Sequence, residues 1–126
     1  MSTDRELLEM AAKAAGIAIM PCTCGSEKWP LKHNEAATGK RGHWNPLVDD
    51  GDALRLAVKL RISLIHEQEY MGGPVLETLE ATSPRSSADG SRHVSTECLN
   101  ELGGDEFAAT RRAIVRAAAA IGEQMP

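Results

Sequence analysis

Residues 44–60 read WNPLVDDGDALRLAVKL, and this stretch decides the fold because it holds the clearest boundary and the densest apolar pattern of the chain. An aromatic residue and an Asn-Pro turn lead into an acidic cluster. Asp49 or Asp50 is suited to cap a helix, since a carboxylate accepts hydrogen bonds from the N–H groups of the first turn and favours the positive end of the helix dipole. The stretch therefore predicts a helix that begins at this cluster.

The predicted helix has a wide apolar face. Four apolar residues fall on one helical side: Ala53, Leu56, Ala57 and Leu60. Leu54 and Val58 are expected to widen this face, which leaves a ridge of Arg55 and Lys59 in water. A helix this apolar for its length must pack against another element.

The length, the composition and the net charge of the chain are typical of a globular protein. With 126 residues the chain is long enough for one domain with a modest core. Only 3% of the residues are aromatic, so we expect a core built from alanine, leucine, isoleucine and valine. The net charge of -4 makes a nucleic-acid partner improbable, because such partners need a basic surface.

The sequence also indicates a compartment. It has no apolar run that approaches a membrane span, and its first residues are polar and charged, unlike a signal peptide. The chain has three cysteines, and this odd number fits reduced thiols better than a secreted disulfide framework. We expect a cytoplasmic protein without a membrane partner.

The first helix is predicted to begin after Thr3, which forms a capping box with Glu6, and to end before Gly16. A short strand is expected at residues 17–20. Residues 21–43 are rich in turn-forming residues and predict a variable loop or an irregular hairpin, with a short strand pair as the alternative.

The second half of the chain predicts strands. Residues 61–70 have partly alternating, β-branched character, and residues 75–81 are expected to return as the second strand of a hairpin. Residues 82–104 form a second variable region. It starts with a polar segment, 82–91, that predicts a loop, and residues 93–97 are expected to add a third short strand.

The last helix is predicted over residues 106–121, with Asp105 as its N-cap and Gly122 as its stop signal. Four of its apolar residues share a face: Phe107, Ile114, Ala118 and Ile121. The order of elements predicts an α+β fold, in which residues 1–126 form a single domain and a small antiparallel sheet is packed with about three helices.

Two clusters have the composition of metal sites. Cys22 and Cys24, with His33 and His43, could suggest zinc, but the C-x-C spacing is tighter than the usual C-x2-C, and free thiols in a polar loop are the better interpretation. The acidic cluster of the central helix lacks the calcium-loop pattern, and helix capping explains it. We therefore predict no metal site.

Catalytic patterns are missing from the sequence. It contains no glycine-rich phosphate loop, no G-x-S-x-G elbow and no paired nucleophile and base. We predict that the protein is not an enzyme, has no catalytic residue and needs no cofactor.

Three arginines on adjoining turns of the last helix form a basic ridge: Arg111, Arg112 and Arg116. Arginine is suited to bidentate recognition of phosphate, so the ridge would bind a small anionic ligand; the alternative is a solvated helix face. If the chain dimerised through its alanine-rich helices, two ridges would line a shared pocket. Trp44, with its neighbour Asn45, or Trp29 would then supply a stacking surface for a base.

Three segments resemble the NinX-like family of small bacteriophage proteins: WNP at residues 44–46, DALRLAVKLRISL at 52–64 and ATRRAIVRAA at 109–118. The resemblance covers the first helix and roughly residues 44–79 and 105–122. Some proteins related to this family are anti-Thoeris factors, which are non-enzymatic dimers that sequester cyclic ADP-ribose-type immune signals, and some also take up cyclic oligonucleotides. The resemblance assigns no ligand contacts, so the arginines and the tryptophan are chosen on chemistry alone.

The resemblance implies a phage-encoded homodimer in the host cytoplasm that sequesters a cyclic nucleotide-type immune signal. The alternative is a phage protein that inhibits a host enzyme, or acts as an adaptor on it, through a protein–protein surface. The acidic balance and the polar segment 82–91 permit this second hypothesis.

Overall fold

The structure is a computed structural model, and it describes residues 3–23, 30–38, 42–70, 75–86, 92–98 and 106–123. The helices in these ranges are α1 (Asp4–Ala15), α2 (Glu35–Thr38), α3 (Asp50–Leu60) and α4 (Glu106–Glu123). The strands form two antiparallel sheets, one of β1 (Ile19–Pro21) and β2 (Leu31–His33), the other of β3 (Ser63–Tyr70), β4 (Val75–Ser86) and β5 (Arg92–Cys98). The predicted α+β class is confirmed, although a second small sheet accompanies the expected one.

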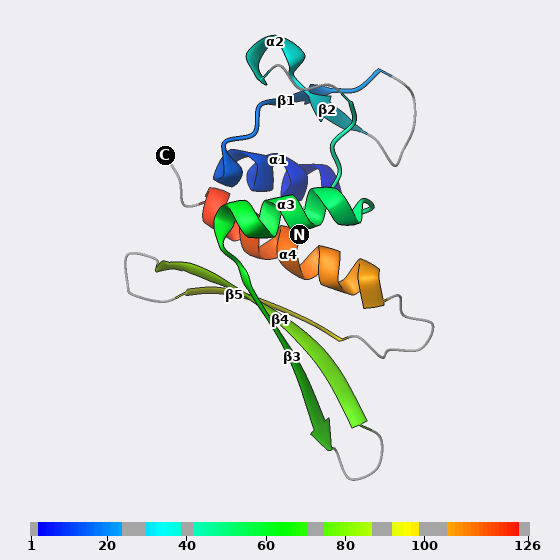
Figure 1. Cartoon of the computed structure of the whole chain (residues 1–126), viewed down its shortest axis with the longest axis vertical. Helices are drawn as coiled ribbons and strands as arrows, with labels where there is room; N and C mark the ends of the chain where they lie inside the picture. Colours follow the sequence, from blue (N-terminus) through cyan, green and yellow to red (C-terminus); the bar gives the residue numbers. More distant parts are fainter. Residues whose placement is uncertain are drawn as a thin grey trace.

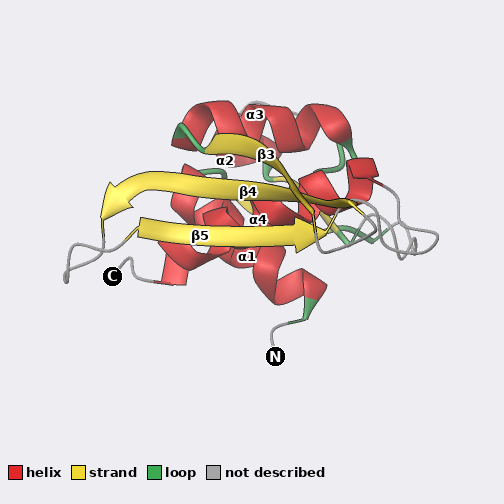
Figure 2. Cartoon of the chain, turned by 90° about the horizontal axis from the view of Figure 1, so that it is seen from below, coloured by secondary structure: helices red, strands yellow, loops and turns green. Residues whose placement is uncertain are grey.

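Helix α4 occupies the centre of the structure. It packs against α1 and α3 on one side and against β4 and β5 on the other. The three-stranded sheet lies below the helices, and the β1–β2 sheet with α2 lies above them (Figure 1). Seen from below, the strands lie in the order β3, β4, β5, and α3 lies beyond β3 on the side away from β4 (Figure 2).

The caps of α1 are those that the sequence predicts. The Thr3 hydroxyl accepts a hydrogen bond from the backbone N–H of Glu6 at 3.2 Å. Gly16 ends the helix in the left-handed region with φ 69°, and its N–H donates to the Lys13 carbonyl at 3.2 Å. Glycine suits this position because it has no Cβ to clash there.

Helix α3 begins at the predicted cluster and ends on an unusual residue. The Asp49 carboxylate caps the helix by accepting from the N–H of Asp52 at 2.8 Å. Arg61 follows the helix with φ 55°, and the N–H groups of Arg61 and Ile62 donate to the carbonyls of Val58 and Ala57. This left-handed turn leads directly from α3 into β3.

The structure corrects the prediction for the second variable region. Strand β4 runs to Ser86, so the predicted loop does not begin at Thr82. The pairing of β4 with β5 shifts register between Thr82 and Ser86. A bulged strand of this kind has little apolar alternation, and the composition of residues 82–86 resembles that of a loop.

The predicted loop at residues 21–43 contains the alternative that the sequence leaves open, a strand pair. β1 and β2 pair from Ile19↔His33 to Pro21↔Leu31. The chain then returns alongside β2, where Trp44 donates its N–H to the Leu31 carbonyl at 3.1 Å. This contact connects the small sheet to the entrance of α3.

The core is built mainly from small residues. More than half of the buried apolar residues in the described ranges are alanines, and most of these lie on α1 and α4. The largest fully buried side chains are those of Trp44, Leu8, Leu31, Leu56, Val115 and Pro46. None of the helices in the described ranges is long and apolar enough to cross a bilayer.

The prediction that Gly122 stops the last helix is wrong. Helix α4 continues to Glu123, and Gly122 is buried within it. A Cβ added at Gly122 would overlap the backbone carbonyl of Met10 in α1. The glycine is needed for close approach of two helices, a role that a sequence pattern does not distinguish from a stop signal.

We expect Gly122→Ala to lower the free energy of unfolding by at least about 2 kcal/mol, because the methyl group has no space against the α1 backbone. The measurement is urea denaturation followed by circular dichroism. The control is Gly51→Ala in α3, where the atoms nearest to an added Cβ are side-chain atoms of Arg55 and the capping carboxylate of Asp49, all at 3.2 Å and none of them backbone. It should change the stability by less than about 1 kcal/mol or increase it. Equal stability of the two variants would contradict the proposed close packing.

Candidate binding pocket between α3, β3 and α4

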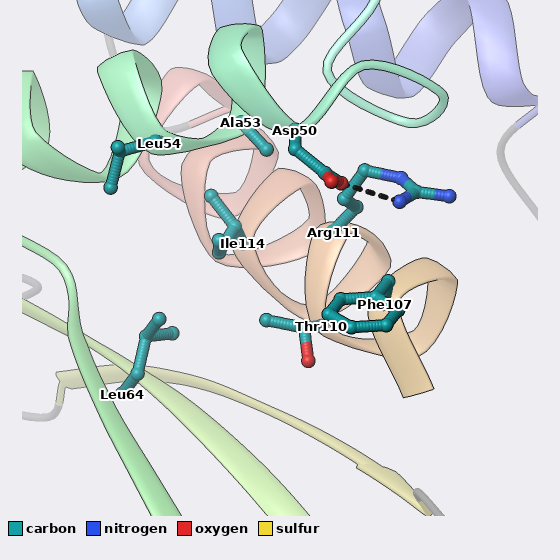
Figure 3. A pocket seen from close by; sticks show the side chains of 8 residues that line it. All are labelled: Asp50, Ala53, Leu54, Leu64, Phe107, Thr110, Arg111 and Ile114. Carbon is teal, nitrogen blue, oxygen red and sulfur yellow. Dashed lines mark hydrogen bonds and ion pairs between the residues drawn. The ribbon is translucent and has the colours of Figure 1, made fainter. Parts of the chain in front are cut away.

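An open pocket of about 400 Å³ lies where α3, β3 and α4 meet. We call it the α3–β3–α4 pocket, and its lining residues are Asp50, Ala53, Leu54, Leu64, Phe107, Thr110, Arg111 and Ile114. Leu54 and Leu64 lie on opposite sides of the opening with Ile114 between them, and Phe107 and Arg111 lie toward one end (Figure 3). Most of the lining is therefore aliphatic or aromatic.

The α3 wall of the pocket is more exposed than the sequence predicts. Leu54 and Val58 are 64% and 68% exposed, so the expectation that they widen the buried face is wrong. The side of the helix that carries Leu56 and Leu60 is buried, and the helix packs against α1 and α4. No described element covers Leu54 and Val58, which are one turn apart.

The α4 wall also carries an apolar side chain that is more exposed than the sequence predicts. Phe107 belongs to the predicted apolar stripe of this helix, but only Ile114, Ala118 and Ile121 of that stripe are buried. Phe107 is 63% exposed. Leu64 and Ile65 at the start of β3 are also exposed. Three of these exposed apolar side chains, Leu54, Leu64 and Phe107, come from three different elements and line one pocket.

Arg111 and Asp50 form the polar end of the pocket. Arg111 donates from Nε to the Leu47 carbonyl at 2.8 Å and from a terminal nitrogen to Asp50 Oδ1 at 2.6 Å. The Arg111 side chain is only 15% exposed, whereas that of Asp50 is 74% exposed. The guanidinium therefore joins α4 to the turn before α3, and its charge is offset by a carboxylate.

The three arginines of the predicted ridge do not come together. Arg112 and Arg116 are exposed and lie one turn apart on α4, but Arg111 is turned toward α3. Thr110, the other polar lining residue of α4, donates its hydroxyl to the Glu106 carbonyl at 2.8 Å. The pocket therefore contains one of the three predicted arginines, and that one is already paired.

The structure places Trp44 in the core, and its predicted stacking role stays a prediction. Trp44 is 2% exposed and is one of the largest fully buried side chains, so its ring offers no face to a ligand. Asn45 is also buried, and its Oδ1 accepts from the N–H of Leu47 at 2.9 Å. Both residues shape the turn into α3. Trp29, the alternative stacking residue, lies outside the described residues.

Asp52 has a structural role that the sequence did not reveal. Its buried carboxylate accepts from the backbone N–H of Asn45 at 2.9 Å and from Arg55 at 2.7 Å. The sequence feature that could have revealed this role is the position of Asp52, three residues after the cap Asp49. From there an acidic side chain can reach back to an earlier backbone N–H. Together, Asp49 and Asp52 fix the start of α3, which carries one wall of the pocket.

The residues weighed as zinc ligands are only partly described. Cys22 is half-buried and donates its backbone N–H to the Pro30 carbonyl at 2.9 Å, and His33 has a buried Nδ1 without a hydrogen-bond partner. Cys24 lies outside the described residues. Within the ranges that the structure describes, no three histidine, cysteine or acidic side chains are arranged to hold a metal ion.

Comparison with protein-family models, with curated proteins and with solved structures finds no match to this chain. The NinX-like resemblance and the function it implies therefore remain predictions, and the pocket must be interpreted from its own chemistry.

We expect Arg111→Ala to lower the free energy of unfolding by about 1.5–3 kcal/mol, because the Leu47 carbonyl loses a charged donor. Asp50→Ala should cost less than about 1 kcal/mol, since its carboxylate is mostly in water. Arg112→Ala, at an exposed position, should cost less than about 0.5 kcal/mol. Chemical denaturation of the three variants provides the measurement. An Asp50→Ala effect as large as that of Arg111→Ala would show that the ion pair, and not the bond to Leu47, joins the two elements.

Proposed function

We propose that the protein acts by binding, without catalysis, and that the α3–β3–α4 pocket takes an apolar segment of a polypeptide partner. One observation carries this proposal: large apolar side chains of three different elements are left exposed around one pocket. Concentrated exposed apolar surface on a water-soluble domain is typical of interaction sites. This corresponds to the protein–protein inhibitor or adaptor hypothesis, and under the resemblance the partner would be a host enzyme.

The charges of the pocket support a polypeptide segment over an anionic ligand. Arg111, the one basic group among the lining residues that the structure describes, is paired with Asp50 at 2.6 Å. The exposed carboxylate of Asp50 would face an incoming phosphate and repel it. An apolar side chain would neither have to displace this ion pair nor be repelled by the carboxylate.

Sequestration of a cyclic nucleotide-type immune signal is the second candidate. The specific observation in its favour is that a pocket of about 400 Å³ has a size common for small-molecule sites, with an aromatic ring, Phe107, beside a guanidinium, Arg111. A base would stack on Phe107 and a phosphate would displace Asp50 from Arg111. The predicted homodimer and the location in the host cytoplasm remain part of this candidate.

Native mass spectrometry separates the two candidates. The protein is mixed with cyclic ADP-ribose isomers and with cyclic di- and trinucleotides, and its mass is recorded with and without them. Under the polypeptide proposal none of these ligands is retained. Stoichiometric retention that is lost in a Phe107→Ala variant would favour the nucleotide candidate, and a dimer mass would confirm the predicted oligomer.

We expect a photo-crosslinking amino acid at position 54 to form a covalent adduct with one stoichiometric partner polypeptide in the cell that expresses the protein. Leu54→Asp should abolish capture of that partner, with a melting temperature close to that of the parent, because the side chain is 64% exposed. The matched controls place the crosslinker, or an aspartate, at Met20, which is also exposed but belongs to β1. Equal capture from positions 20 and 54, or none from either, would contradict the proposal.

A further inference from the structure

The strand that borders the pocket is an edge strand. In the three-stranded sheet, β3 pairs with β4 along its whole length, from Ser63↔Thr82 to Tyr70↔Val75. Its other edge pairs with no strand in the described part of the chain. An unpaired edge presents a row of backbone N–H and C=O groups that can pair with an extended peptide.

The helical layer extends past this edge. Helix α4 covers β4 and β5, whereas α3 lies beyond β3 on the side away from β4 (Figure 2). Adjacent strands are about 4.8 Å apart and a helix with its side chains is about 10 Å wide, so a fourth strand beside β3 would lie beneath α3. The sheet is thus narrower than the layer of helices that covers it.

The exposed side chains lie where such a strand would be. Leu54 of α3 and Leu64 of β3 lie on opposite sides of the pocket opening (Figure 3), and Val58 follows Leu54 by one turn. A strand in this position would direct every second side chain toward α3 and the pocket. Its apolar residues would cover the surface that the described elements leave exposed.

Charge determines which occupant fits. The sequence of β3, SLIHEQEY, contains Glu67 and Glu69 and no lysine or arginine. A second copy of β3 would pair two acidic sequences with each other, and like charges in facing strands are destabilising. A strand that carries lysine or arginine complements this edge, as it complements the net charge of -4.

We propose that an extended segment of the partner, with apolar side chains alternating with lysine or arginine, adds to the β3 edge as a fourth strand beneath α3. This inference rests on the proposed function and specifies its binding mode. Backbone hydrogen bonds to β3 hold the segment, the pocket selects one apolar side chain, and the basic residues complement the acidic composition of the strand.

The test uses the full-length protein and a synthetic octapeptide of alternating lysine and valine with one central leucine. Two N-methylated isomers carry methyl groups on the odd or on the even amides, so that only one isomer blocks the edge that faces β3. Two further peptides serve as controls: one has the same composition in an order that makes an amphipathic helix, and one has glutamate in place of lysine. Fluorescence anisotropy measures affinity, and NMR hydrogen exchange reports on the β3 amides.

We expect the alternating peptide to bind and one N-methylated isomer to bind at least about tenfold more weakly, while the other isomer is unchanged. The glutamate peptide and the Leu54→Asp protein should each show a loss of at least about tenfold, since charge complementarity and the apolar pocket are removed in turn. Exchange should slow at every second amide of Ser63–Tyr70, the strand residues that the structure describes as β3.

Three results would overturn the inference. The first is that the helical-order peptide binds as well as the alternating one. The second is that both N-methylated isomers bind like the parent peptide. The third is that the protein without peptide is a dimer in which the β3 amides are already protected. The proposed function has its own test, the crosslink at position 54. If that crosslink captures a polypeptide while no octapeptide binds at millimolar concentration, strand addition is wrong and the pocket remains the partner site.

Discussion

The close approach of α1 to α4 is the constraint on which the rest of the structure depends. At Gly122 the α4 backbone lies so near the Met10 carbonyl that no side chain fits between them, and alanines continue this contact along both helices. Helix α4 is thereby fixed in the centre, and α3, β4 and β5 pack against its remaining sides. Since α4 also supplies Phe107, Arg111 and Ile114, the position of the pocket follows from the same contact.

The distribution of residue sizes is unusual in this structure. Small side chains fill much of the described core, whereas Leu54, Val58 and Phe107 lie mostly in water. Each buried alanine contributes little hydrophobic free energy, but it also costs no side-chain conformational entropy. Large apolar side chains contribute most to stability when buried, and under the proposed function these side chains would be buried by the partner.

Much of the fold was predictable because its boundaries depend on local chemistry. Thr3, Gly16 and Asp49 act within one turn of their own helix, and their roles follow from residue type and spacing. The β1–β2 pairing and the extension of β4 to Ser86 depend on contacts between distant segments, and local propensity does not show them. Gly122 belongs to this second group, because its role is set by a neighbouring helix.

The candidate site was predicted less well than the fold, for a related reason. Helical spacing groups Phe107 with Ile114, but it cannot show that Ile114 is buried while Phe107 is mostly exposed. Helical spacing also groups Arg111 with Arg112. In the structure Arg111 donates to the Leu47 carbonyl, whereas Arg112 is exposed. Trp44 was chosen as a stacking surface on its chemistry alone, and local sequence does not show that it is buried where the chain returns along β2.

The left-handed residue Arg61 has a consequence for the two walls that it joins. No flexible loop separates α3 from β3, and the N–H groups of Arg61 and Ile62 are both bound to carbonyls of the last turn of α3. The α3 and β3 walls are therefore joined by one short, hydrogen-bonded turn. Such a connection limits the conformational freedom that the receptor has to lose, so most of the ordering cost of association would fall on the partner segment.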